Sequence, residues 1–296
     1  MVTPLNKKEV LEIMPEKRVI PLENLYLSQS LHNFSGSLGR SIVYTNYLCD
    51  LNEVIALKDR DGFFRVPKAL RNHDDWRLFQ ELEAQADVII TSKVYLSRFA
   101  TEGENAQDVL TEFEAGGEFE ELGEWRLKNG FKSRRPDLAI VGRSPDLIIP
   151  KSATQAGRNI YFFSTYDLAD SDDAKSLRDM GVTVAGAGAE GVEGKVMIDY
   201  LAMRRNYRTI YAVAGPSIIK ILLDARVLDR LYVTQVNRKI LFDDPSSVKR
   251  ILSNGKRVSG IPDFALAKRY LQDKVVTEDQ TVTTQEFLLY ENSAKG

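Results

Sequence analysis

Short apolar runs alternate with segments whose apolar residues recur at helical spacing along most of the chain. The apolar runs that predict strands are residues 41–56, 87–91, 137–141, 160–163, 182–185 and 209–214. The segments with helical spacing are residues 74–86, 171–180, 194–206 and 217–225. This alternation predicts an α/β fold with a mostly parallel sheet and helices on both faces.

The two ends of the chain depart from this alternation. Residues 267–275 and 283–290 predict a hairpin-like pair of strands, which forms an antiparallel C-terminal edge of the sheet. Residues 1–40 indicate an N-terminal extension that packs on the domain or on a partner subunit. Residues 41–296 then form a single domain with an acidic insertion near 101–126. Nine acids and no lysine or arginine lie between Thr101 and Glu124, which favours a solvated, partly helical insertion over a lid.

The segment from residue 209 to residue 230 predicts a strand, a tight turn, a helix and a second strand. Gly215 permits the turn, Pro216 suits the first helical position, and the hydroxyl of Ser217 can bond a free amide there. The unpaired N–H groups and the dipole of a helix N-terminus favour negative charge. An anion site and a plain strand-to-helix connection both fit these residues.

Composition excludes several classes of function. The chain has 296 residues, 43% of them hydrophobic, with 40 lysines and arginines against 42 acids. A net charge of −2 gives no general attraction to nucleic acid or to an anionic membrane. Cys49 is the only cysteine, so neither a disulfide framework nor a thiolate metal cluster is expected. The N-terminus lacks the apolar core of a signal peptide, and we expect a cytoplasmic protein without membrane spans.

The segment around Gly215 resembles the matching part of the bacterial riboflavin-biosynthesis pyrimidine reductases, where a strand ends in Glu-(Ala/Gly)-Gly before a helix. The likeness continues upstream and downstream, in the same order, over about residues 41–240. The segments that carry it are residues 76–92, 136–141, 160–165, 213–216 and 226–233. The resemblance implies a dihydrofolate-reductase-like three-layer α/β/α fold, a homodimer, and NADPH-dependent reduction of a ribosyl-pyrimidine, a small-molecule substrate.

The resemblance also implies where the cofactor binds, namely the carboxyl ends of the strands, where open α/β sheets usually hold ligands. The expected cofactor residues are Ser92, Lys93, Gly142, Arg143, Ser144, Thr165, Ala214, Gly215, Pro216 and Ser217. A lysine or arginine at such a position can pair with a phosphate. Plain alternatives stay open: Ser92 can simply cap a helix, and Arg143 can simply face solvent.

The expected substrate residues are Asp50, Asn52 and Arg77. Here the sequence departs from the family pattern: Glu53 stands where the family has glycine, and Val213 where it has glutamate. Glu83 likewise replaces an arginine. These changes favour a diverged relative over the orthodox enzyme, and they leave open a catalytically inactive nucleotide-binding or regulatory protein on the same fold.

Residues 186–191 match the G-x-G-x-x-G pattern of dinucleotide-binding folds, but no acid follows about 20 residues later, so the match is weak. The chain has two histidines, no Cys/His cluster and no G-x-S-x-G elbow, which argues against zinc and triad chemistry. Hydride transfer fits this shortage of acid–base residues, because the cofactor carries the reaction and the protein aligns it. The sequence singles out no catalytic residue.

Overall fold

The computed structural model describes residues 8–93, 96, 113, 115–147, 149 and 157–295. Its contacts divide the chain into two compact units. The first, here called the hairpin unit, comprises Met1–Gln29, Thr45–Phe79 and Asp229–Gly296. The second, here called the parallel unit, comprises Ser30–Tyr44 and Gln80–Leu228. Residues 97–112, which hold the amino-terminal half of the predicted acidic insertion, lie outside the described residues.

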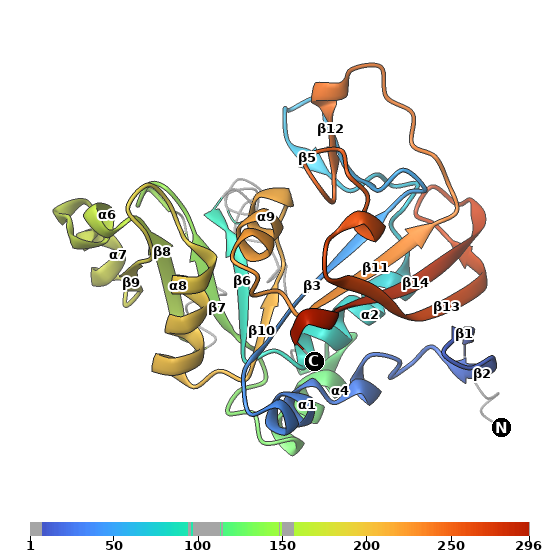
Figure 1. Cartoon of the computed structure of the whole chain (residues 1–296), viewed down its shortest axis with the longest axis horizontal. Helices are drawn as coiled ribbons and strands as arrows, with labels where there is room; N and C mark the ends of the chain where they lie inside the picture. Colours follow the sequence, from blue (N-terminus) through green and yellow to red (C-terminus); the bar gives the residue numbers. More distant parts are fainter. Residues whose placement is uncertain are drawn as a thin grey trace. The chain divides into compact units, whose positions relative to one another are not determined.

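The parallel unit is built around strands that pair in the order β3, β10, β6, β7, β8 and β9 (Figure 1). Their bounds are β3 Ile42–Cys49, β6 Val88–Ser92, β7 Asp137–Val141, β8 Ile160–Ser164, β9 Thr183–Gly186 and β10 Thr209–Ala212. The pairs from β10 through β9 are all parallel. Most of their side chains are buried, as expected for apolar strands covered on both faces.

The helices of the parallel unit connect these strands. Their bounds are α1 Leu31–Leu38, α4 Glu120–Lys128, α6 Tyr166–Asp170, α7 Lys175–Asp179, α8 Gly194–Asp199 and α9 Pro216–Asp224, with a π-helical turn over Tyr200–Arg204. Helix α8 packs closely on α9 at Gly194, where an added Cβ would lie 2.5 Å from the carbonyl oxygen of Ile221. Helix α2, His73–Ala84, contributes residues to both units.

The hairpin unit contains the strands β2, β1, β13, β14, β11 and the last residues of β3, in that order. The bounds are β1 Glu9–Met14, β2 Arg18–Pro21, β11 Arg230–Val236, β13 Phe264–Val276 and β14 Val282–Asn292. A small antiparallel sheet is formed by β12 Val248–Arg250, β4 Val54–Lys58 and β5 Phe64–Arg65. Strand β11 is almost wholly buried and pairs with β14, so its apolar residues belong to the chain's own core.

The described residues also form short 3-10 helices, with bounds Leu27–Gln29, Asp172–Ala174, Pro245–Ser247, Val258–Gly260 and Ser293–Lys295. Among the described residues, no helix is long and apolar enough to cross a membrane.

The predicted alternation of strands and helices is confirmed, as is the antiparallel pairing of the two C-terminal strands. Their predicted place at the edge of the sheet is wrong, because β1 pairs with β13 on its outer side. The single strand predicted over 41–56 is wrong, because a turn separates β3 from β4. In that turn the carboxylate of Asp50 accepts the N–H groups of Asn52 and Val54, each at 2.8 Å. The single helix predicted over 171–180 is also wrong: a 3-10 turn starting after Ser171 precedes α7.

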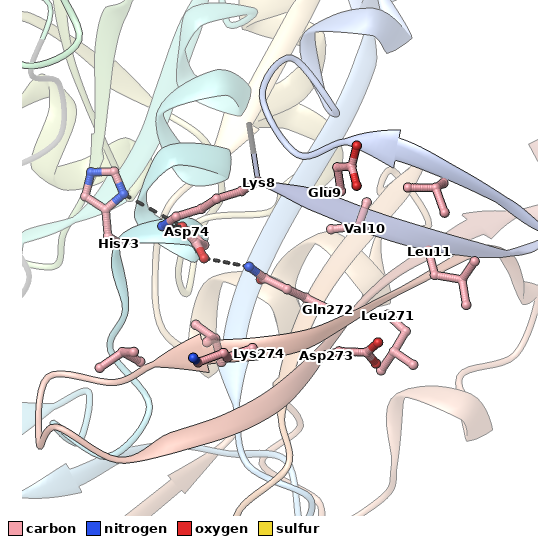
Figure 2. Close-up of a pocket in the computed structure, with 13 residues that line it drawn as sticks. Lys8, Glu9, Val10, Leu11, His73, Asp74, Leu271, Gln272, Asp273 and Lys274 are labelled. Carbon is pink, nitrogen blue, oxygen red and sulfur yellow. Dashed lines mark hydrogen bonds and ion pairs between the residues drawn. The ribbon is translucent and has the colours of Figure 1, made fainter. Parts of the chain in front are cut away.

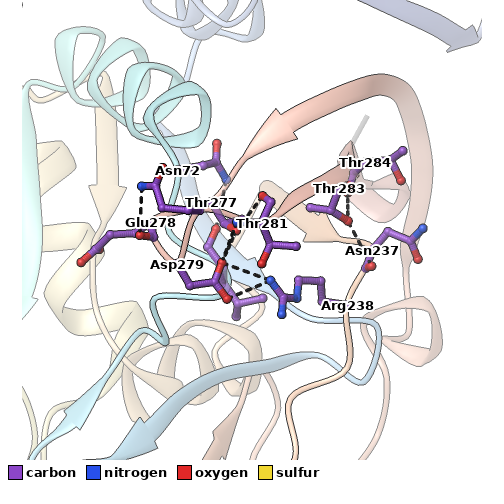
Figure 3. Close-up of polar contacts among 11 residues, drawn as sticks. Asn72, Asn237, Arg238, Thr277, Glu278, Asp279, Thr281, Thr283 and Thr284 are labelled. Atoms are coloured by element: carbon purple, nitrogen blue, oxygen red, sulfur yellow. Dashed lines mark hydrogen bonds and ion pairs between the residues drawn. The ribbon is translucent and has the colours of Figure 1, made fainter.

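The turn between β13 and β14 is closed by polar contacts (Figure 3). Thr277 donates its hydroxyl to Asp279 at 2.6 Å, and the backbone N–H of Thr281 donates to the same carboxylate at 3.2 Å. Arg238, which follows β11, reaches both carboxylate oxygens of Asp279 at 3.2 and 2.9 Å. These hydrogen bonds give the polar residues of this turn a structural role.

Helix α2 begins with a carboxyl group that is buried in the hairpin unit. Burial raises the pKa of Asp75 from its ordinary 3.8 to about 6; a hydrogen bond with Thr234 opposes the shift and nearby Asp74 adds to it. Between pH 3.8 and about pH 6 the native state therefore keeps a proton that the unfolded chain has lost. This group stabilises the fold most below pH 4, and its contribution is lost as pH rises towards 6.

We predict that Asp75→Asn removes this pH dependence. A shift of this size corresponds to about 3 kcal/mol, so the variant gains up to that amount relative to the wild type between about pH 4 and pH 7. Urea unfolding at several pH values measures it. Asp199→Asn, at an exposed carboxylate paired with Lys195, is the control. Parallel pH profiles for Asp75→Asn and wild type would contradict the assignment.

Candidate functional site

The carboxyl ends of the parallel strands bring most of the expected cofactor residues to one edge. Pairing sets Ser92 opposite Val141 and Val141 opposite Phe163, and Ala212 opposite Ile90. The residues that follow these strands therefore lie along the same edge of the parallel unit. We call this group the carboxyl edge; it comprises Ser92, Lys93, Gly142 to Asp146, Ser164, Thr165 and Val213 to Ser217.

Gly142 starts the loop after β7, where the chain passes close to its neighbours. A Cβ at this position would lie 2.7 Å from the ring of Phe162 and 3.3 Å from the Cβ of Lys93. Its backbone N–H donates to the carbonyl of Phe163 at 3.1 Å. Only glycine fits, so packing fixes where the following residues leave the sheet.

Lys93 is paired within the chain. Its ammonium group donates to the hydroxyl of Ser144 at 2.5 Å and forms an ion pair with Asp146. These contacts, the Lys93 hydrogen bond first, lower the pKa of the Asp146 carboxyl to about 2. The expected phosphate-binding lysine therefore already holds an anion.

Arg143 is exposed, and no partner for its guanidinium lies among the described residues. It is thus a cation at the carboxyl edge, as predicted, that the described part of the chain does not neutralise. A planar guanidinium in this position is suited to bidentate contact with a phosphate.

Thr165 has a structural role. Its hydroxyl accepts the N–H of Leu168 at 3.3 Å and caps the short helix α6.

Two other hydroxyls differ from that of Thr165. The hydroxyls of Thr91, in β6, and Ser164, at the end of β8, are buried and have no partner among the described residues. An unmade hydrogen bond of this kind costs about 1–3 kcal/mol. These two hydroxyls can therefore gain from a polar ligand or a water molecule.

The segment from Ala214 to Ser217 forms the predicted turn and helix start. Pro216 begins α9, Gly215 precedes it, and the helix has no side-chain cap. The exposed Ser217 therefore does not supply the cap that its sequence position suggests. Gly215 has ordinary extended dihedral angles, φ −71° and ψ −175°, and a Cβ there would meet nothing within 4 Å. The backbone of Gly215 therefore lies beside open space, and the fold itself does not require glycine at this position.

The first two glycines of the G-x-G-x-x-G match, Gly186 and Gly188, contrast with Gly215. A Cβ at Gly186 would lie 2.6 Å from the ring of Tyr166, and one at Gly188 would lie 2.0 Å from the carbonyl oxygen of Gly191. Gly188 also has a φ of +153°. Internal packing explains Gly186 and Gly188, whereas a Cβ at Gly191 would meet nothing within 4 Å.

Two of the expected substrate residues lie in the turn between β3 and β4, in the hairpin unit. Asp50 is fully buried, and besides the two bonds in its own turn it accepts the N–H of Ile240 at 2.8 Å. Asn52 is half-buried, and its carbonyl accepts from Arg250. Arg77 is half-buried in α2. Three backbone donors therefore occupy Asp50, which makes it a structural residue of this turn.

Glu53 explains one departure from the family pattern. Its φ is +60°, in the left-handed region where glycine is the usual residue. The side chain is mostly buried, and both carboxylate oxygens accept the N–H of Val258 at 3.1 Å. Burial raises the pKa of this carboxyl, and the Val258 bond opposes the shift. Glycine adopts this backbone conformation readily. In this chain the buried hydrogen bond with Val258 compensates for the cost of placing a glutamate in it.

The hairpin unit also contains a cavity of about 600 Å³ between β1, β13 and the start of α2 (Figure 2). Asp74 lies in its wall and is engaged on both oxygens, by Lys8 and by Gln272, the latter at 2.6 Å. Gln272 in turn accepts from Gln285 at 2.8 Å. The lining carries three carboxylates, two lysines and one histidine beside apolar residues, and Asp74 is already engaged within the chain.

Sequence reasoning missed one buried cation in the parallel unit. Arg126, from α4, donates to the carbonyls of Ala84 at 2.9 Å, Ala86 at 2.6 Å and Ser133 at 3.0 Å, and so binds the end of α2. Burial lowers its pKa to about 10. Its position inside a run of charged residues hid this role, because the sequence alone shows no contact with carbonyls distant in the chain.

No family model matches the sequence, and no curated protein matches it. Solved structures do match: Acinetobacter baumannii RibD has a TM-score of 0.56 at 15% identity, over 90% of this chain and 62% of that one. A pyrimidine reductase-like protein from Corynebacterium diphtheriae has a TM-score of 0.55 at 19% identity, over 85% of this chain and 91% of that one.

The riboflavin biosynthesis reductase of Saccharomyces cerevisiae matches with a TM-score of 0.51 at 13% identity, over 90% of this chain and 98% of that one. The chain has the fold of the pyrimidine reductases. The dihydrofolate-reductase-like α/β fold implied by the sequence resemblance is therefore confirmed. The chain spans 59% and 62% of the length of the two RibD chains that it matches.

We predict that Asp50→Ala destabilises the protein by about 3–5 kcal/mol, because it leaves three backbone N–H groups without their charged acceptor. Asn52→Ala, in the same turn, keeps that carboxylate and is expected to cost less than about 1 kcal/mol. Urea unfolding measures both. Equal stabilities of the two variants would show that Asp50 does not hold the turn.

Proposed function

We propose that this chain is an NADPH-dependent reductase that transfers hydride to a ribosyl-pyrimidine or a related small molecule. The observation that carries the proposal is the carboxyl edge, where a lysine, a helix start without a side-chain cap, and an arginine with no partner in the described part of the chain follow neighbouring strands. Each of these features suits a phosphate. The pyrimidine reductase fold supports the same reading.

In this proposal the nucleotide lies along the carboxyl edge of the parallel unit. Arg143 and Lys93 bind phosphate groups, and the N-terminus of α9 adds its dipole. Gly215 lets the nucleotide come close to the backbone, and the hydroxyls of Thr91 and Ser164 are available as buried polar contacts. The cofactor supplies the hydride; the residues of the chain bind it, orient it and exclude water.

The proposed substrate is a ribosylamino-pyrimidine, or a relative, whose ribose is reduced from an imine-like form to a ribityl chain. Asn52 can bond an amide or a pyrimidine edge, and Arg77 can pair with a phosphate. Asp50 contributes by holding the turn that carries Asn52. Homodimer formation and a cytoplasmic location are parts of the same proposal.

A second candidate is a nucleotide-binding protein on this fold that lacks turnover. Val213 favours it, because this residue stands where the family has glutamate and is buried, with its N–H bonded to Ile90 at 2.8 Å. Oxidation of NADPH in the presence of the ribosylamino-pyrimidine distinguishes the two. Turnover supports the reductase, and tight NADPH binding without turnover of any pyrimidine tested supports the second candidate.

We predict that Gly215→Leu weakens NADPH binding at least about tenfold, since a side chain there enters space that the nucleotide needs, and a tenfold loss corresponds to only ~1.4 kcal/mol. The folded chain tolerates the change, because the backbone angles are ordinary and the added Cβ meets no neighbour. Calorimetric titration with NADPH and NADH measures the affinity.

Gly36→Leu is the matched control, since Gly36 lies in α1 of the same unit and also has nothing within 4 Å of an added Cβ. This control is expected to bind NADPH as the wild type does. Failure of the wild type to bind either nucleotide would refute the proposed function. Equal binding by both leucine variants would move the nucleotide away from Gly215.

A further inference from the structure

One carboxylate oxygen at the carboxyl edge receives donors from two different strand ends. Lys93, directly after β6, and Ser144, in the loop after β7, both contact Oδ1 of Asp146. The ammonium of Lys93 also donates to the hydroxyl of Ser144 at 2.5 Å. A cation and a hydroxyl from separate segments thus converge on a single anionic atom.

The two charged partners differ in exposure. The side chain of Lys93 is 18% exposed and that of Asp146 is 78% exposed. The cation is therefore held against the sheet, beside the close contact at Gly142, whereas the carboxylate stands in solvent on a loop. A lysine whose side chain is mostly buried gains from an anionic partner at its charged end. Asp146 meets that need from the side on which a ligand from solvent would arrive.

A carboxylate oxygen and a phosphate oxygen make the same kind of charge-assisted hydrogen bond with lysine and serine. The contacts that hold Asp146 also keep its pKa at about 2, so the side chain is an anion at neutral pH. Asp146 therefore presents to Lys93 and Ser144 the chemistry that a phosphate group would present.

We propose that Lys93 and Ser144 form a subsite for a phosphate group of the nucleotide, and that Asp146 occupies this subsite in the free protein as an internal competitor. The identity of the ligand rests on the proposed function. When the phosphate binds, the carboxylate moves out into solvent; no covalent bond forms or breaks. Asp146 thereby sets the affinity without contacting the bound phosphate.

The size of the effect follows from the strength of the ion pair. A partly exposed ion pair of this kind favours, by a small factor, the state in which Asp146 occupies the subsite. The apparent affinity for phosphate is lower by the same account, because only molecules with an empty subsite can bind it. Removing the competitor is therefore expected to tighten phosphate binding about two- to sixfold. Removing Lys93 is expected to abolish this gain, because the subsite is then absent.

The test uses the full chain and two probes, NADPH and inorganic pyrophosphate, each titrated by calorimetry. The variants are Asp146→Asn, Lys93→Met and the double variant, with Asp199→Asn as a control that removes one negative charge elsewhere in the parallel unit. Circular dichroism and thermal unfolding show that each variant is folded. A general charge effect tightens binding equally in all backgrounds, whereas competition acts only where Lys93 is present.

Tighter binding by Asp146→Asn, with no gain from Asp199→Asn or in the Lys93→Met background, supports the proposal. The same pattern with pyrophosphate, in a protein that binds no NADPH, retains the anion subsite and refutes the proposed function. Unchanged pyrophosphate affinity in Asp146→Asn, or an equal gain without Lys93, overturns the proposal even where NADPH binds tightly.

Discussion

Parallel pairing of β10, β6, β7 and β8 is the constraint on which the candidate site depends. Parallel strands end at one edge, and the register places Ser92 opposite Val141 and Val141 opposite Phe163. Residues separated by about fifty positions in the sequence, such as Lys93 and Ser144, are thereby brought into hydrogen-bonding distance. The close contact at Gly142 then fixes where the loop that carries Ser144 begins. The chemistry of this edge is a consequence of strand register.

Glycines lie in two different environments in this chain. At Gly142, Gly186 and Gly188 an added Cβ would collide with the chain itself, so packing alone explains the residue. At Gly215 the added Cβ would meet nothing, and the dihedral angles are ordinary. Gly36, Gly191 and Gly260 have the same open surroundings, so the placement of the nucleotide at Gly215 rests on its position just before α9 at the carboxyl edge.

The sequence could predict the alternation of strands and helices because buried parallel strands are short, continuous apolar runs and their helices have one apolar face. It could not predict the break after Cys49, because the turn depends on a carboxylate that bonds N–H groups up to 190 positions away, at Ile240. For the same reason Asp50 resembled a ligand-binding residue. The carboxyl-edge residues were predictable from their positions after the strands, but the pairing of Lys93 with Asp146 needed three-dimensional proximity.

In the proposed function the nucleotide lies on the carboxyl edge of the parallel unit. Hydrogen–deuterium exchange of the backbone amides, measured with and without saturating NADPH, tests it most directly. The account predicts added protection at residues 142–146, at 164–166 and at 213–218, with little change around the cavity beside Asp74. Protection confined to that cavity, or to the glycine-rich loop at 186–191, would contradict the account.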